Sequence, residues 1–258
     1  MRLALVVMLV LAAVPSAARA QQPLGIVDQT LARFDRDTLA PDGPSLEVPE
    51  PHTAPVLSPD RERLVIGVST NPEPGAPSVG RVGVFVVDAQ RMAVVHAIQA
   101  GIAAEAVAYP GVVAAVLQDG RLIVVDPESG AITYDAPIGH SRCAPEAVQV
   151  GRTAVFVNEV FARGVEVTTV GARGRVRSAR IPLEVDSRGG GCYAAALVAD
   201  PARRRVLVAG ATRVAAVTIP SLRPRSHRIG DRSPGRTAEL VRGRGLAVAG
   251  RRGLRVLD

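Results

Sequence analysis

The chain has 258 residues, a formal net charge of +7 and a hydrophobic fraction of 47%, which is typical of a folded protein. Aromatic residues make up 3% and tryptophan is absent, which disfavours quinone docking and sugar binding on aromatic platforms. The core therefore has to be built from Val, Leu, Ile and Ala, and branched side chains of this kind favour β-strands.

The first twenty residues have the layout of a secretory signal. Arg2 gives a positive start, residues 3–14 are apolar, and Ala18-Arg19-Ala20 offers small residues where a signal peptidase reads. The apolar run is shorter than the roughly 20 residues that a spanning helix needs. We expect a signal peptide at 1–20 and, at 21–258, a single secreted, extracytoplasmic domain with no membrane span.

One strand-and-turn pattern recurs along the chain. An apolar strand is followed by a polar turn that starts at Asp, whose side chain caps nearby main-chain N–H groups. The clearest copy runs from Val124 to Ile132. The other copies start at Phe34, Val86, Val217 and Val256. The copy at Val217 has Thr218 in place of Asp.

A second pattern lies between these copies and predicts a strand, a tight turn and another strand. It begins near Leu57, Glu105, Glu146, Ala199 and Glu239. The Pro-rich segments 41–59 and 71–78 are predicted to be exposed loops. Equivalent points recur about every 40 to 50 residues, a period typical of β-propeller blades with four short strands each.

Two motifs resemble those of the YVTN and WD40-like propeller repeats. Ser58-Pro59-Asp60-Arg61 followed by Leu64-Val65-Ile66 is similar to their "SPDG" signature, although Arg61 stands where Gly is usual. Val125-Asp126-Pro127-Glu128-Ser129-Gly130 is similar to their turn motif. The resemblance implies an all-β propeller of four-stranded blades and is almost silent on function.

The repeat predicts about five blades. The chain is expected to enter at a third strand, near Leu31–Asp35, and to stop at a third strand, near Leu254–Asp258. Either residues 46–49 add a fourth strand to the last blade and close a five-bladed ring, or the chain is an incomplete ring of six or seven blades. Both alternatives stay open at the level of the sequence.

Cys143 and Cys192 occupy matching points of adjacent repeats, so we expect a disulfide between them in an exported protein. Residues that precede the inner strands would gather at one mouth of the central channel. Such a group could hold a cation or supply a general acid and base, although pairing with arginine is the simpler expectation. The candidates are His52, Glu105, His140, Glu146 and Glu239, with Asp186 and Asp231 at related positions.

The arginines concentrate in a few stretches that could bind an anionic polymer or an acidic protein. These are residues 173–180, 203–205, 223–228 and 242–255. Nucleic acid is disfavoured, because no aromatic residues stand among these arginines. No phosphate-binding loop, nucleophile elbow or paired-cysteine zinc spacing occurs, so we expect no cofactor and no metal.

The leading functional hypothesis is a secreted, non-enzymatic propeller that binds a ligand or serves as a scaffold. Its partner is unknown, with an extracellular protein or an anionic polymer as the expected kinds. The alternative is a propeller lyase or hydrolase that acts at the channel mouth, and a third possibility is a degenerate propeller without activity. The sequence does not choose among them.

Overall fold

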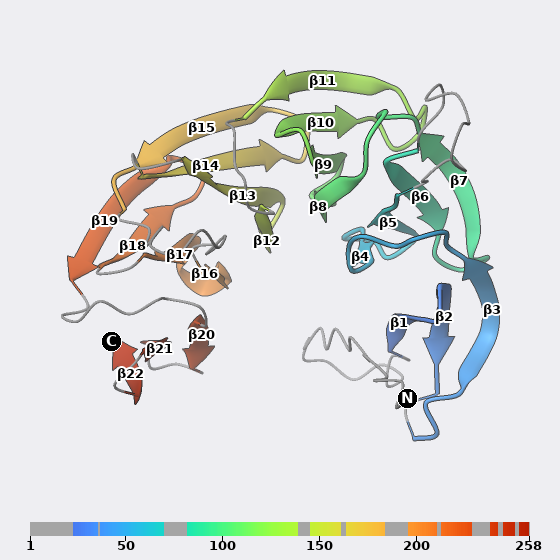
Figure 1. Cartoon of the computed structure of the whole chain (residues 1–258), viewed down its shortest axis with the longest axis horizontal. Coiled ribbons are helices and arrows are strands. Elements are labelled where there is room, and N and C mark those ends of the chain that lie inside the picture. The colour runs from blue at the N-terminus through green and yellow to red at the C-terminus, as the bar shows by residue number, and fades with distance from the viewer. Residues whose placement is uncertain are drawn as a thin grey trace. The chain divides into compact units, whose positions relative to one another are not determined.

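The structure is a computed structural model, and it describes the following parts of the chain (Figure 1): residues 23–35, 37–69, 82–138, 145–160, 164–183, 196–210, 213–228, 238–241, 245–250 and 253–257. These parts contain 22 strands and one short 3-10 turn, Pro201–Arg203. No helix in the described parts is long and apolar enough to cross a membrane. By its contacts the chain divides into two compact units, residues 1–104 and 105–258.

The first unit holds two antiparallel sheets whose strands follow each other in chain order. One sheet has three strands: β1 (Leu24–Val27), β2 (Thr30–Phe34) and β3 (Pro41–Glu47). The other has four: β4 (Val56–Leu57), β5 (Arg63–Gly67), β6 (Val84–Asp88) and β7 (Ala93–Ile98).

The second unit continues the same plan. Its first four-stranded sheet consists of β8 (Ala104–Ala108), β9 (Val113–Leu117), β10 (Arg121–Val125) and β11 (Ile132–Pro137). The next consists of β12 (Glu146–Val150), β13 (Thr153–Val160), β14 (Gly164–Gly171) and β15 (Val176–Ile181). The third consists of β16 (Ala196–Asp200), β17 (Arg205–Ala209), β18 (Arg213–Thr218) and β19 (Arg223–Arg228). A three-stranded sheet follows: β20 (Ala238–Val241), β21 (Gly245–Gly250) and β22 (Gly253–Leu257).

The predicted all-β architecture of four-stranded blades is therefore confirmed, and so are the predicted hairpins. Two details differ. The chain enters one strand earlier than expected, because β1 pairs with β2 ahead of it. Leu46 belongs to β3 and pairs with Leu31 of β2, so this segment is the last strand of the first sheet and not an addition to the C-terminal one.

The loop predicted at 41–59 is wrong for its first part, because β3 begins at Pro41. The strand lies at the edge of its sheet, and its first five residues are exposed. Proline cannot donate to a ladder, but an edge strand needs donors on one side only. The register shift between Ala32 and Phe34 further relaxes the pairing near Pro44. The predicted loop at 71–78 lies outside the described residues.

The sheets are buried on both faces, as β13 illustrates. Val155 and Val157 pack in a cluster with Val206 and other residues of the following sheet. Ala154 and Phe156, which alternate with them, pack in a second cluster with residues of the preceding sheet. Successive side chains of a strand point to opposite faces, so the inner strands are mainly apolar on both faces. Asn158 of β13 and Thr168 and Thr169 of β14 are buried polar exceptions. In the second unit, Figure 1 shows the first strands β8, β12 and β16 on one side of the sheets and the last strands β11, β15 and β19 on the other.

The repeated Asp turns cap the chain between the third and fourth strands. The Oδ1 atoms of Asp35, Asp88 and Asp126 accept hydrogen bonds from the main-chain N–H groups two and three residues later, at 2.8 to 3.1 Å. The bonds from Thr38 and Arg91 hold the pKa of Asp35 and of Asp88 below its ordinary value. The role that the sequence predicted for these carboxylates is confirmed.

The last residue of each turn adopts a left-handed conformation. Gly130 has a φ of 71°, and Leu39, Met92 and Leu222 at the matching positions have φ of 55°, 50° and 56°. Glycine is favoured here because other residues crowd their own Cβ. Met92 and Leu222 are buried, so their side chains gain core contacts that offset this strain.

We predict that Asp126→Ala lowers the free energy of unfolding by about 1–2 kcal/mol, because two main-chain N–H groups lose their acceptor. Asp126→Asn keeps one side-chain oxygen and is expected to lose less. Urea titration of the three proteins provides the measurement. Equal stability of the Ala variant and the wild type would show that the Asp side chain does not hold this turn.

Candidate functional site

Glu146 is the one predicted mouth residue whose side chain has a described partner. It begins β12, the first strand of its sheet, and its Oε2 accepts a hydrogen bond from the main-chain N–H of Leu197 in β16 at 2.8 Å. Because β16 is the first strand of the next sheet, the carboxylate joins the first strands of two successive sheets. Burial raises the pKa of Glu146, and the hydrogen bond from Leu197 opposes part of that rise.

The other candidates are placed less fully. His52 is exposed, and its main-chain N–H donates to the carbonyl of Gly67 at 2.9 Å. Glu105 is half-buried in β8. Glu239 lies in β20. His140, Asp186 and Asp231 lie outside the described residues, so a shared mouth stays a prediction.

Cys143 and Cys192, the two residues of the predicted disulfide, both lie outside the described residues. Among the residues that the structure does describe, no group of three or more His, Cys, Asp or Glu side chains could hold a metal ion.

Asp200 is a buried carboxylate that the sequence did not single out as a site. Asp200 is 1% exposed to solvent. Its Oδ2 accepts hydrogen bonds from Nε of Arg205 at 2.8 Å and from Nη1 of Arg203 at 3.3 Å, and its Oδ1 accepts one from the Arg203 main chain. Burial raises the pKa of Asp200, but the bonds from the two arginines outweigh it, so the pKa lies below its ordinary value. The Asp-Pro-Ala-Arg-Arg-Arg string was the signal for this cluster.

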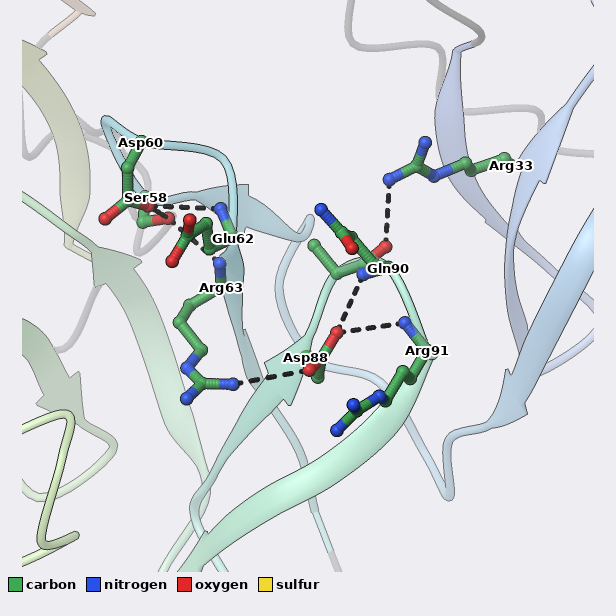
Figure 2. A network of polar contacts seen from close by, with 9 residues as sticks. Arg33, Ser58, Asp60, Glu62, Arg63, Asp88, Gln90 and Arg91 are labelled. Carbon is green, nitrogen blue, oxygen red and sulfur yellow. Dashed lines mark hydrogen bonds and ion pairs between the residues drawn. The ribbon is translucent and has the colours of Figure 1, made fainter.

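The Ser58–Arg63 turn is a second polar network (Figure 2). Oγ of Ser58 donates to Asp60 and accepts from the Arg63 main chain at 3.0 Å. The hydrogen bond from Ser58 is the main cause of the lowered pKa of Asp60. Arg61 has a φ of 67°, so it occupies the left-handed position where propeller repeats usually have Gly.

Figure 2 also shows how this turn meets its neighbours in the first unit. The Arg63 guanidinium lies 3.5 Å from Oδ2 of Asp88, its cross-strand partner. Arg33 of the preceding sheet donates to the carbonyl of Ala89 at 3.0 Å. These contacts give the carboxylates of Asp60 and Asp88 partners in neighbouring turns and strands.

No family model matches the chain, and no curated protein matches its sequence. Solved structures do match its fold. BamB from Moraxella catarrhalis has a TM-score of 0.60 at 12% identity, covering 92% of this chain and 66% of the BamB chain. A chain of the mitotic checkpoint complex gives 0.57 at 12% identity, covering 92% and 74%. The Neurospora crassa Pan2 WD40 domain gives 0.53 at 10%, covering 91% and 70%.

The chain has a WD40-like β-propeller fold. Identities of 10 to 12% support the fold and carry no residue roles. The propeller spans roughly two thirds to three quarters of the lengths of these neighbours. Its sheets are the blades, and the Glu146–Leu197 bond links the innermost strands of two successive blades.

We predict that Glu146→Gln makes the propeller less sensitive to pH. A carboxyl whose pKa is raised in the folded state stabilises the fold below its ordinary value of 4.5, and this stability is lost as the pH rises through the folded pKa. Glutamine keeps an oxygen for Leu197 without a buried charge, so the variant should be at least as stable as the wild type at pH 7. Melting temperatures measured between pH 4 and pH 8 test this prediction. A melting temperature that falls more steeply with rising pH in the variant than in the wild type would contradict it.

Asp200→Asn should have the opposite pH signature. The lowered pKa of Asp200 stabilises the fold above its ordinary value of 3.8, and this contribution disappears as the pH falls through the folded pKa. We expect the free energy of unfolding of the variant to be about 2 kcal/mol lower than that of the wild type at pH 7, because two guanidinium groups lose their charged acceptor. This difference in the free energy of unfolding should become smaller at acidic pH. A difference that does not change with pH would contradict the proposed ion cluster.

Proposed function

We propose that the protein is a secreted, extracytoplasmic propeller of the YVTN type that serves as a protein-interaction scaffold and catalyses no reaction. The neighbour from the mitotic checkpoint complex is part of a protein assembly. The fold supports the same kind of role here, since rigid repeated blades present surfaces and edges at fixed positions.

The observation that carries the proposal is the outer strand β7. It ends its sheet, so one of its hydrogen-bonding edges has no described strand beside it. Val94 and Val95 of this strand are 39% and 37% exposed, and β7 contains no charged Arg, Asp or Glu. Exposed apolar side chains on an open edge favour a protein partner that adds an extended segment.

The described carboxylates support the absence of catalysis. Asp35, Asp60, Asp88 and Asp200 accept turn hydrogen bonds that lower their pKa, so they are held as ions in structural roles. Glu146 has a raised pKa, which is a property of many general acids. Its hydrogen bond to Leu197 gives it a structural reason for being where it is.

The test combines crosslinking with substitutions on β7. In an exporting host, a photoreactive residue at Ala93 should capture a discrete protein. We expect Val94→Glu with Val95→Glu to abolish that product and Gln90→Glu, in the preceding turn, to retain it. Capture that survives the double substitution would overturn the role of β7. Hydrolysis or elimination on a substrate panel that Glu146→Gln abolishes would establish the enzyme alternative instead.

The proposed export makes a separate prediction about the mature protein. Removal of residues 1–20 should leave Gln21 as the first residue, and the oxidising compartment should join Cys143 to Cys192. Amino-terminal sequencing and intact mass with and without reductant provide the measurements. Two cysteines that alkylate before reduction, or a mature protein that retains Arg2, would refute export in this form.

A further inference from the structure

The turns at one end of two successive blades carry an unusual concentration of arginine. In the sheets β12–β15 and β16–β19, the turns after the first and third strands lie at the same end, because each sheet is a meander. The two sheets also run the same way: the Glu146–Leu197 bond joins the starts of β12 and β16, and both strands pack in one cluster. We call the exposed arginines at this end the basic rim: Arg152, Arg173, Arg175, Arg203, Arg204 and Arg223.

The two sheets that carry the basic rim supply almost no counter-charge of their own. Among the described residues at this end of the two sheets, Asp200 is the one carboxylate, and it is buried under Arg203 and Arg205. Glu146 and Glu159 lie at the opposite end of their sheet, where β12 starts and β13 ends. Glu166 is the cross-strand partner of Arg180. Within these two sheets the rim arginines therefore have no described acid to pair with, apart from the contact of Arg203. The nearest acids of the preceding sheet, Asp126 and Glu128, follow Val124, whose Cγ1 would lie 3.4 Å from a Cβ on Gly174.

The fold itself does not demand arginine in these turns. In the same unit, the turn after β10 carries Asp126 and Glu128, and in the first unit Asp35 and Asp88 hold the matching turns. The matching turn is thus acidic in one blade, carries Arg173 and Arg175 in the next, and is followed directly by Arg223 in the one after that. Clustered like charges cost stability when nothing balances them, so a bound anion is the natural counterpart.

The rim arginines stand on ordered turns. The N–H of Gly171 donates to the carbonyl of Arg175 at 3.0 Å, and the N–H of Arg204 donates to Pro201 at 3.1 Å. The carbonyl of Arg204 in turn accepts from Ile219 at 2.8 Å, which ties the two turns of the last four-stranded sheet together. Ordered turns lower the entropic cost of presenting the guanidinium groups. They also use the main-chain groups, so a peptide cannot add here as a strand.

The composition of these turns narrows the ligand. Residues 151–152, 172–175, 201–204 and 219–222 contain no aromatic side chain on which a base could stack. Their large apolar residues, Ile219 and Leu222, are buried and cannot enter a lipid interface. Guanidinium forks bind carboxylate and sulfate groups in a bidentate manner. We propose that the basic rim binds an acidic polysaccharide, through the carboxylate or sulfate groups of successive sugars.

This binding goes beyond the proposed protein scaffold and is independent of β7. The test uses the full chain with immobilised heparin and polygalacturonate as sulfated and carboxylated probes and with dextran as the neutral probe. The rim variant replaces Arg173, Arg175, Arg204 and Arg223 by glutamine. The control variant makes the same change at Arg61, Arg91, Arg180 and Arg228, which lie outside the rim, so both variants lose four charges.

We expect the wild type to bind both acidic polymers and not dextran, and the affinity to fall steeply with salt. The rim variant should bind about tenfold or more weakly and with a shallower salt dependence, whereas the control should stay within about twofold. Circular dichroism and melting temperature check that both variants fold. Equal weakening of the two variants would show an effect of net charge alone and overturn the site. Tighter binding to anionic vesicles or single-stranded DNA would overturn the assignment to polysaccharide. A loss of polysaccharide binding on Val94→Glu with Val95→Glu would place the binding on the β7 surface and overturn the basic rim as its site.

Discussion

The structure depends on the burial of each sheet between its neighbours. β9 and β13 show the constraint most clearly, since residues on both of their faces are buried in Val-, Ala- and Leu-rich clusters. Each fully buried Val or Leu contributes about 1.5–3 kcal/mol, so the positions that face these clusters are filled mainly by apolar side chains. Charged side chains are thereby placed mainly at the two ends of the sheets and on the outer strands, while the uncharged Asn158, Thr168 and Thr169 are buried in β13 and β14.

This division explains the behaviour of the carboxylates. Those at the turns accept several N–H groups or guanidinium contacts and stay ionised, as Asp88 and Asp200 do. Glu146 lies between the inner strands of two blades, where burial dominates and its pKa rises. One fold thus contains carboxyl groups with opposite pH signatures, and the position in the blade decides which one applies.

The outer strands and the turns are freer to vary from one blade to the next. β3 tolerates two prolines at an edge, β7 exposes valines, and β19 is rich in arginine. The turns differ as widely, from Asp126 and Glu128 in one blade to Arg173 and Arg175 in the next. Function in such a fold is carried by these variable positions, while the buried strands keep the blades alike.

Much of the fold could be predicted from the sequence, because the Asp turns and the Val-rich strands are local signals that repeat. The capping by Asp126 and the special position of Arg61 follow from a few neighbouring residues. The sequence could not show that Pro41 begins an edge strand, since only pairing with β2 makes that conformation favourable. It also could not show that Glu146 reaches Leu197, or that arginines between 152 and 223 gather at one end of two sheets. Those outcomes depend on which strands become neighbours, and that is decided by the packing of whole blades.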